Sequence, residues 1–253
     1  KSWHFVRENF SAIVTQSNDI KEFRELVLDL AVKGRLVSQY PNDKSILETL
    51  DQMKLEKAEI LQNSKSRKKT KRRLIERFES GIKLKLPKGW ISVELNDITI
   101  FIDYRGKTPP KTKSGVKLIT AKNVRDGIIN LEPQEFISED TYKTWMTRGF
   151  PRKGDVLFTT EAPLGKAAVV EVKERFALAQ RIINIQPLSG VSGYFLMWLI
   201  LSPWFQGRLR EKATGMTAKG IKASKLKLIE IPLPPLPEQK RIVSKVDELI
   251  KLC

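Results

Sequence analysis

The chain has 253 residues, enough for one large domain or two small ones with a sizeable apolar core. Its 46 lysines and arginines exceed its 29 aspartates and glutamates, and the formal net charge of +17 favours partners that carry phosphates or anionic membrane surfaces. No apolar run approaches the roughly 18 residues that a membrane-spanning helix needs, and the start lacks the apolar core of a signal peptide. The single cysteine excludes an internal disulfide framework, so we expect a cytoplasmic protein.

The first zone, residues 1–85, is predicted to be helical and to end in a basic linker. A helix opens near residues 17–19 and ends at Gly34, with Ile20, Phe23, Leu26, Val27 and Leu30 on one face. After a turn at residues 40–43, a second helix places Ile46, Leu50, Met53 and Leu61 on one side. Seven of the ten residues 64–73 are cations, which is typical of a linker with non-specific affinity for polyanions.

The middle zone, residues 86–230, has a different texture, because short apolar runs alternate with glycine and proline signals. The pattern predicts strands at residues 116–120, 155–160, 167–172 and 182–186, and helices at residues 193–201 and 203–212. We therefore expect an α+β protein. One globular mixed β/α domain would be flanked by the N-terminal helical segment and by the start of a long C-terminal coiled-coil helix.

The last zone, residues 231–253, begins with a proline-rich segment that can form neither a helix nor a central strand. Pro237 and Glu238 are suited to the start of a helix. From there Ile242, Val246, Leu249 and Cys253 follow the spacing of a coiled-coil seam. A seam this short needs a partner. We expect that partner to be the first helix, with Phe23, Leu26 and Leu30 packed against Ile242, Val246 and Leu249.

The sequence offers little for catalysis. The one histidine, His4, lies near the chain start, and Cys253 is the last residue, so neither a histidine-based dyad nor a zinc site is convincing. Residues 160–167 do not match the sequence pattern of a phosphate-binding loop, because Thr160 occupies the position of its first glycine. Asp155 and Glu161 could belong to a metal-dependent nuclease, but Pro163 occupies the position of the expected lysine. We predict no metal site and no catalytic residue.

Cations and amides in the middle zone point to DNA instead. Lysine and arginine contact phosphates, arginine can also fork onto guanine, and asparagine and glutamine can pair with adenine. The candidate contacts are Arg105, Lys107, Thr108, Lys111, Lys113, Lys122, Asn123, Arg125, Thr160, Gln180, Arg181, Thr217 and Lys219. Of these, Arg105, Asn123, Gln180, Arg181 and Thr217 are our candidates for reading base edges.

Each of these candidates also has a structural interpretation. The loop at residues 104–115 could be an ordinary solvated basic hairpin loop. Asn123 could be a turn former ahead of Asp126 and Gly127. Residues 179–181 and 159–161 could form a structural hydrogen-bonded pair. Residue types and spacing leave these alternatives open.

Six motifs in a fixed order resemble the DNA-specificity subunit of type I restriction–modification enzymes. They are LAVKGRLV at residues 30–37, PND at 41–43, LPKGW at 86–90, RGKTP at 105–109, GDVLF at 154–158 and PLPPLPEQKRIV at 232–243. The resemblance extends over nearly the whole chain. It implies a target-recognition domain followed by a helix, in a subunit that usually holds two such domains separated by two antiparallel helices.

The resemblance also implies the partners. Each recognition domain would read one part of a split target in double-stranded DNA, and the helices would dock a methyltransferase subunit that binds S-adenosylmethionine and methylates adenine. A further restriction subunit would translocate and cut DNA. This chain shows one recognition domain, so it resembles the first half of such a subunit, either truncated or able to pair with a second copy of itself. It would hold no cofactor of its own.

Three hypotheses follow. The favoured one is a non-catalytic DNA-reading subunit that recruits an adenine methyltransferase, whose target base is flipped out of the stack. The second is a small nuclease that uses Asp155 and Glu161. The third is an assembly scaffold, which predicts weak, sequence-blind binding that modest salt abolishes.

Overall fold

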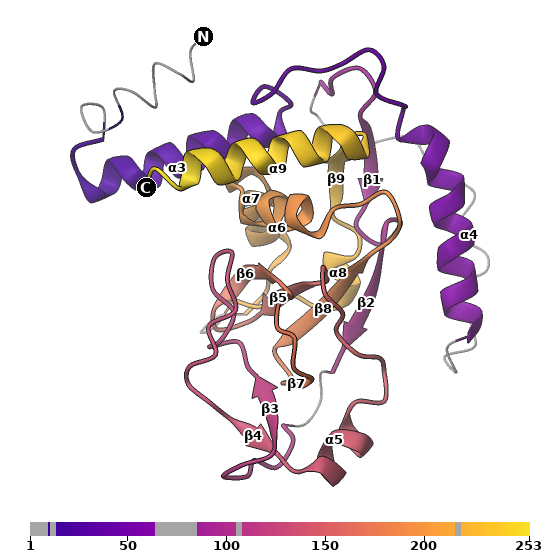
Figure 1. The fold of residues 1–253 in the computed structure, drawn as a ribbon, viewed down its shortest axis with the longest axis vertical. Helices are drawn as coiled ribbons and strands as arrows, with labels where there is room; N and C mark the ends of the chain where they lie inside the picture. The colour runs from indigo at the N-terminus through magenta and orange to yellow at the C-terminus, as the bar shows by residue number, and fades with distance from the viewer. Residues whose placement is uncertain (1–9, 11–13, 64–84, 105–107, 216–218) are drawn as a thin grey trace.

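The computed structural model describes Phe10 and residues 14–63, 85–104, 108–215 and 219–253. Most of the helices gather at one end, a four-stranded sheet lies in the middle, and a smaller lobe that contains one short helix forms the other end (Figure 1). The helices are α3 (Ser17–Val32), α4 (Leu47–Asn63), α5 (Glu139–Trp145), α6 (Gly193–Leu201), α7 (Pro203–Lys212), α8 (Ala223–Leu226) and α9 (Leu236–Ile250). The strands are β1 (Ile91–Glu94), β2 (Thr99–Asp103), β3 (Val116–Ile119), β4 (Phe136–Ile137), β5 (Val156–Thr160), β6 (Leu164–Val169), β7 (Phe176–Leu178), β8 (Ile182–Pro187) and β9 (Glu230–Leu233).

The strands form three sheets. The central sheet is antiparallel in the order β2-β8-β5-β6, and 15 of its 22 strand residues are buried. The distal sheet has the order β4-β3-β7, in which β3 and β7 run parallel. A two-stranded sheet pairs β1 with β9. The expected α+β class is confirmed, because the sheets are mainly antiparallel and most of the helices lie together at one end of them.

The two cores correspond to the two ends of the molecule. The larger core runs from α3, α4 and α9 through α6 and α7 into the central sheet. The smaller core lies between β3, β7 and α5 and the opposite face of β5 and β6, where Leu157 and Ala168 are buried. Alternate residues of β5 therefore enter different cores, as the period of a strand requires. The helical segments before residue 86 thus share a core with the central sheet.

Local signals explain why the predicted helices form. Gly34 ends α3 with a φ of +64°, the left-handed conformation that glycine adopts without strain. Ser192 and Ser202 cap α6 and α7, and their side chains accept hydrogen bonds from the amides of Phe195 and Phe205. These helices are confirmed within a residue or two of their expected ends.

The proline-rich segment behaves as its chemistry requires. Pro232 lies in β9, which among the described strands pairs with β1 alone, so the missing amide breaks no central ladder. Helix α9 then begins at Leu236 with Pro237 in its first turn and Glu238 close behind. The chain passes from a short strand straight into the C-terminal helix.

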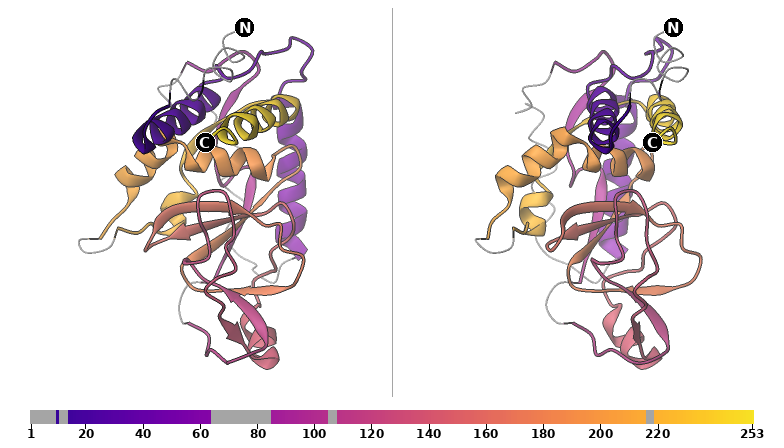
Figure 2. Two further views of the ribbon diagram at one scale, coloured as in Figure 1. Left: turned by 60° about the vertical axis from the view of Figure 1, so that its left-hand side comes forward. Right: turned by 90° about the vertical axis from the view of Figure 1, so that its left-hand side faces the viewer.

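The expected contact between the first and last helices is confirmed, and Figures 1 and 2 show α3 and α9 side by side. Ile242, Val246 and Leu249 are buried, while Phe23 and Leu30 pack at the margin of the core.

Two details of this packing were predicted wrongly. The α3 side chains that the core buries include Val27 and Ala31, whereas Leu26 is 52 % exposed. The reason is that α3 packs on α6 and α7 as well as α9, which turns its buried face away from a two-helix seam. Cys253 is exposed beyond the end of α9, so it does not continue the seam. Within the described residues, no helix is long and apolar enough to cross a membrane.

Candidate nucleic-acid interface

A pocket of about 280 Å³ opens where the parallel strands β3 and β7 end. The carboxyl ends of parallel strands are a common position for ligand sites in open sheets. Five of the residues predicted to contact DNA line this pocket, although they come from three separate stretches of sequence. They are Thr108, Lys111, Lys122, Gln180 and Arg181.

The polar groups at the pocket differ in how firmly they are held. Lys111 pairs with Glu135 at 2.8 Å, whereas Lys122 is exposed. Arg181 lies 3.4 Å from Glu161, and both side chains are nearly half exposed. An ion pair this exposed contributes little to stability. Arg181 can therefore exchange its carboxylate for a phosphate or a base edge at low cost.

Thr160 forms part of the support beneath Arg181 and does not face solvent. Its side chain is buried, its amide donates to the Arg181 carbonyl at 3.0 Å, and its hydroxyl lies 3.3 Å from the same oxygen. The expected juxtaposition of residues 159–161 with residues 179–181 is thus present. However, the prediction that Thr160 contacts DNA disagrees with its burial, and the structural hydrogen-bond alternative describes it.

Asn123 is also structural. Its side chain is 1 % exposed and accepts hydrogen bonds from the amide and hydroxyl of Thr120, both at 2.8 Å. Its amide group donates to the carbonyls of Asn130 and Pro133 at 2.9 and 3.1 Å. All of its polar atoms are used within the loop, so the prediction that Asn123 reads a base disagrees with the structure. Its neighbour Lys122 faces solvent.

The remaining candidates divide into two sets. Lys113, Arg125 and Lys219 are exposed away from the pocket lining. Arg105, Lys107 and Thr217 lie outside the described residues, as do the basic run at residues 64–73 and His4.

A further basic surface, which was not predicted, lies on α7 and α8. Its cations are Arg208, Arg210, Lys212, Lys222 and Lys225. The sequence signal for them was the cluster of cations at residues 208–227, which helical spacing brings to one region.

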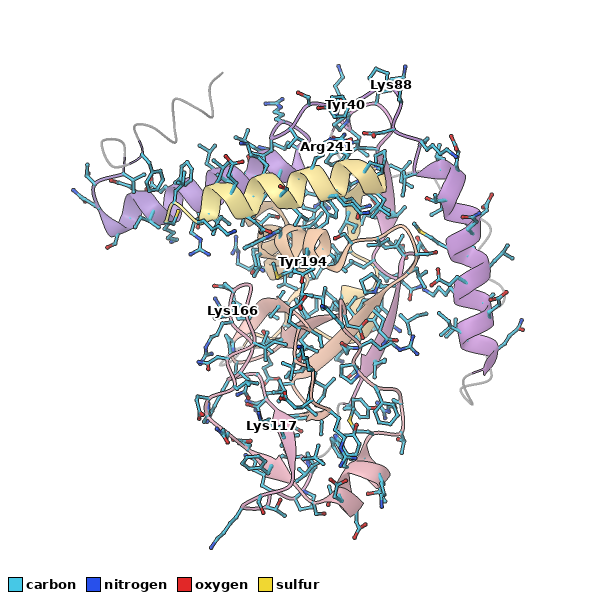
Figure 3. The ribbon with its side chains drawn as sticks, viewed as in Figure 1. Tyr40, Lys88, Lys117, Lys166, Tyr194 and Arg241 are labelled. Atoms are coloured by element: carbon cyan, nitrogen blue, oxygen red, sulfur yellow. The ribbon has the colours of Figure 1, made fainter. Side chains whose placement is uncertain are left out.

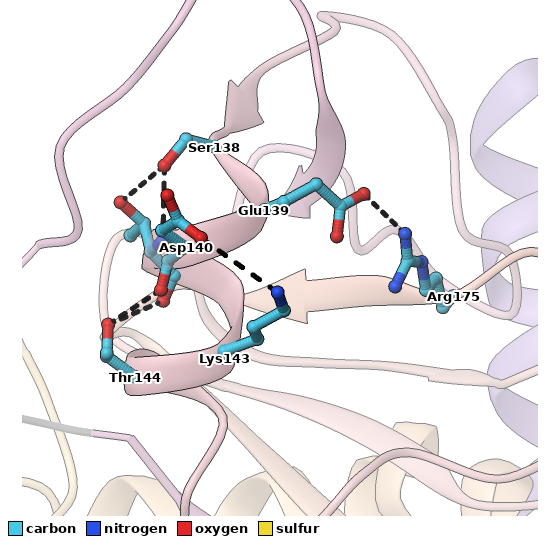
Figure 4. A network of polar contacts seen from close by, with 7 residues as sticks. Ser138, Glu139, Asp140, Lys143, Thr144 and Arg175 are labelled. Carbon is cyan, nitrogen blue, oxygen red and sulfur yellow. Dashed lines mark hydrogen bonds and ion pairs between the residues drawn. The ribbon is translucent and has the colours of Figure 1, made fainter.

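The region around α5 contrasts with the pocket. At α5, Arg175 pairs with Glu139 and Lys143 lies 3.9 Å from Asp140, while Ser138 caps the helix (Figure 4). The same region has a second cavity of about 570 Å³, which both cations and carboxylates line. Carboxylates stand beside the cations here, so this region is less favourable for phosphate than a surface whose cations have no carboxylate nearby.

The nuclease alternative is not supported by the geometry. Asp155 precedes β5 and Glu161 follows it, so a five-residue strand, roughly 16 Å long, separates them. The Asp155 carboxylate accepts hydrogen bonds from Asn184 and Gln186 at 2.7 and 2.8 Å, and burial raises its pKa. Within the described residues, no three histidine, cysteine or acidic side chains are placed to hold a metal.

Three of the ordered motifs meet at the start of α9, where Tyr40, Lys88 and Arg241 are labelled in Figure 3. Arg241 stacks over Tyr40 with 4.3 Å to the ring centroid and donates to both Asp43 oxygens at 2.5 and 3.3 Å. Trp90 donates to the Glu238 carboxylate at 3.0 Å, and burial raises the pKa of Glu238. The motifs therefore share one structural task, which is to fix the start of α9.

Gln239 completes this junction. Its side-chain oxygen accepts a hydrogen bond from the Ser192 amide at 2.8 Å, and its amide group donates to Gly190 and Pro234 at 3.0 and 2.9 Å. Because Ser192 caps α6, one buried side chain ties the start of α9 to the start of α6. The direction of α9 relative to the central sheet is set here.

The family model for the type I restriction modification DNA specificity domain matches residues 87–253 of this chain. The chain belongs to that family. The resemblance seen in the ordered motifs is confirmed, and the match extends over the pocket, the central sheet and α9.

Similar proteins agree. The chain is 27 % identical over 260 residues to the type I restriction enzyme EcoAI specificity subunit of Escherichia coli, covering all of this chain and 44 % of that protein. It is 31 % identical to the MjaIX specificity subunit of Methanocaldococcus jannaschii, covering 66 % of this chain and 40 % of that protein. This specificity domain therefore spans less than half the length of these relatives.

One solved structure shares the fold. It comes from work on complex assembly and conformational transition of the type I R-M system, and matches with a TM-score of 0.51 and 21 % identity. The alignment covers 93 % of this chain and 48 % of that one.

Proposed function

We propose that this specificity domain binds double-stranded DNA and reads one half of a bipartite target for a type I restriction–modification complex. The observation that carries the proposal is the pocket at the ends of β3 and β7, which gathers five sequence-predicted polar residues from separate loops. Family membership supplies the biological setting.

Within this proposal, Gln180 and Arg181 are the candidates for base reading. Both line the pocket, and their side chains carry the donors and acceptors that distinguish adenine and guanine in the major groove. Lys111, Lys122 and Thr108 lie around them and would contact phosphates, which position the protein without specifying sequence. Arg105, Lys107 and Thr217 remain proposals on residue type alone.

We propose further that the chain is not an enzyme and recruits one. The methyltransferase subunit would dock on the helical end formed by α3 and α9, carry S-adenosylmethionine and methylate adenine. The restriction subunit would join through the assembled complex. A second specificity domain, from the same subunit or from a second copy of this chain, would read the other half-site. Because the target is DNA, we expect the complex to work in the cytoplasm.

The partner proposal is tested by using the full chain as bait in lysate of the source cell and identifying retained proteins by mass spectrometry. We expect recovery of a methyltransferase that carries an Asn-Pro-Pro-aromatic motif. A bait with Leu26→Asp tests whether the exposed apolar residue of α3 contributes, since this variant changes an exposed position and should fold. Failure of the wild-type bait to retain any methyltransferase would contradict docking by this chain.

A further inference from the structure

Helix α7 contains a glycine that no packing requirement explains. A Cβ atom at Gly207 would meet nothing within 4 Å among the described residues, and its backbone does not adopt the left-handed conformation that favours glycine. Glycine inside an exposed helix is less stable than alanine, because it loses more conformational freedom on folding. The bare backbone at this position is therefore a cost to the fold, and close approach by a ligand is a common reason for such a glycine.

The surface around Gly207 is basic. Arg208, Arg210 and Lys212 follow it on α7, and Glu211 is the one acidic residue in the sequence of that helix. None of these three cations is paired with a carboxylate of the described chain, and the same holds for Lys222 and Lys225 at α8. We call these five cations with Gly207 the α7–α8 surface. It differs from α5, where carboxylates stand beside the cations.

Two of these cations are held in position without losing their charge. The Arg208 guanidinium stacks over the Trp204 ring, 4.5 Å from its centroid, which orients the planar group while leaving its N–H edges available. Lys225 lies 3.5 Å from the Lys212 carbonyl at the end of α7 and so joins the two helices. An arginine oriented in this way is suited to a bidentate contact with phosphate.

The α7–α8 surface is linked to the pocket through the backbone of residues 220–221. The Ile221 amide donates to the Thr160 carbonyl at 3.0 Å, and Gly220 pairs with Glu161. Glu161 in turn faces Arg181 at the pocket rim. Helices α7 and α8 stand out together on one side of the molecule in the right-hand view of Figure 2. A duplex whose bases meet Arg181 would therefore have basic surface beside it.

We propose that the α7–α8 surface binds the phosphates of duplex DNA that flank the bases read at the pocket, with Gly207 as the point where the sugar–phosphate backbone comes closest. This inference rests on the proposed function. It adds residues that the motifs do not mark, and it assigns them to affinity and salt dependence rather than to sequence preference.

The sharpest test is Gly207→Ala. Because the added methyl group enters open space, this change should raise Tm by about 2–4 °C. If a phosphate backbone approaches Gly207, the same change should weaken DNA binding about threefold or more at 100 mM salt, on the order of one weakened phosphate contact. A variant that is more stable and binds DNA as well as the wild type would overturn the role of Gly207, since misfolding could not account for it.

The cations are tested by combining Arg208→Ala, Lys222→Ala and Lys225→Ala and measuring the affinity for duplex DNA across a salt series. Losing three phosphate contacts should reduce the slope of log K against log[salt] by roughly 2 to 3, with the ratio of specific to non-specific affinity unchanged. Lys21→Ala is the matched control, because Lys21 is an exposed lysine on α3.

The outcomes separate this inference from the function on which it rests. An unchanged slope in a chain that still prefers one sequence would overturn the inference alone. If the triple variant no longer captured the methyltransferase but bound DNA as the wild type does, the inference would also be overturned, because the surface would then bind an acidic protein. If the wild type shows no sequence preference, the proposed function fails, whereas a reduced slope in the triple variant would still support a phosphate surface.

Discussion

The helical end and the distal lobe of this molecule are built on different principles. At the helical end, α3, α6 and α9 are joined by buried apolar side chains, together with a few buried polar residues such as Gln239. In the distal lobe, loops are held by individual polar side chains such as Asn123, and exposed cations stand beside them. The first region tolerates variation that preserves its apolar pattern, whereas the second can change its ligand through single loop residues.

The largest effect is expected at the helical end from a matched pair of substitutions. Leu249 is 0 % exposed and Leu26 is 52 % exposed, so the same change removes a core side chain at one site and a surface side chain at the other. Leu249→Ala should lower the free energy of unfolding by about 2–5 kcal/mol and Leu26→Ala by less than about 0.5 kcal/mol. Urea unfolding followed by circular dichroism measures both. Equal losses would show that the buried face of α3 or α9 is assigned wrongly.

A second effect concerns a buried cation, which contrasts with the exposed cations around the pocket. Lys57 on α4 is 3 % exposed and donates to the carbonyls of Asn96 and Thr99, the latter at 3.1 Å. Burial is the main cause that lowers its pKa to about 8. The charge of Asp97 acts in the opposite direction and raises the pKa, while repulsion from Lys227 lowers it further. The folded pKa is thus below the value of 10.5 in the unfolded chain.

The sign of the pH effect follows from this difference. Between pH 8 and 10.5 the unfolded chain binds more protons at this residue than the folded chain. The cost of burying the charged lysine is therefore fully present below pH 8, and stability should rise as the pH increases through this window, by at most about 3 kcal/mol. The difference between wild type and Lys57→Met in urea unfolding at several pH values isolates this contribution. Parallel stability profiles would contradict the lowered pKa.

A smaller effect is expected in the distal lobe. Asn123→Ala removes both acceptor bonds to Thr120 and both donor bonds to the carbonyls of Asn130 and Pro133. We expect a loss of about 1–3 kcal/mol, because buried groups are left without partners. Faster hydrogen exchange at the Asn130 amide, which donates to the Asn123 carbonyl, should report this loosening locally.

The neighbouring residue provides the control for that change. Lys122→Ala alters an exposed side chain and should leave stability within about 0.5 kcal/mol of the wild type. If Asn123→Ala proved as stable as Lys122→Ala and lost sequence preference for DNA instead, Asn123 would be a base contact and its structural assignment would be wrong.

The sequence predicts the local elements of this fold well, because their signals lie within a few residues. Periodic apolar positions and caps located α3, α4, α6 and α7, and proline chemistry located the start of α9. The strands β1, β2, β4, β7 and β9 and the helices α5 and α8 were not predicted, and β1 and β4 show why. They have four and two residues, and their pairing with β9 and β3 depends on contacts distant in sequence.

The candidate site was harder to predict than the fold. Residue type marked Gln180 and Arg181 as candidates, but it could not show that β3 and β7 run parallel and bring them beside Lys122. Nor could it separate Lys122 from Asn123, since adjacent loop residues differ in burial only once the loop closes. The cations of α7 and α8 were missed because no motif marks them.

The central claim is that the pocket at the ends of β3 and β7 reads base edges. It is tested most directly by selecting bound sequences from a pool of random duplex DNA, with the methyltransferase partner present, for the wild type and for Arg181→Ala. We predict one enriched half-site for the wild type and loss of preference at one or two of its positions for the variant, about 1–3 kcal/mol per base. An Arg181→Ala variant that enriches the same half-site with undiminished preference at every position would contradict the claim.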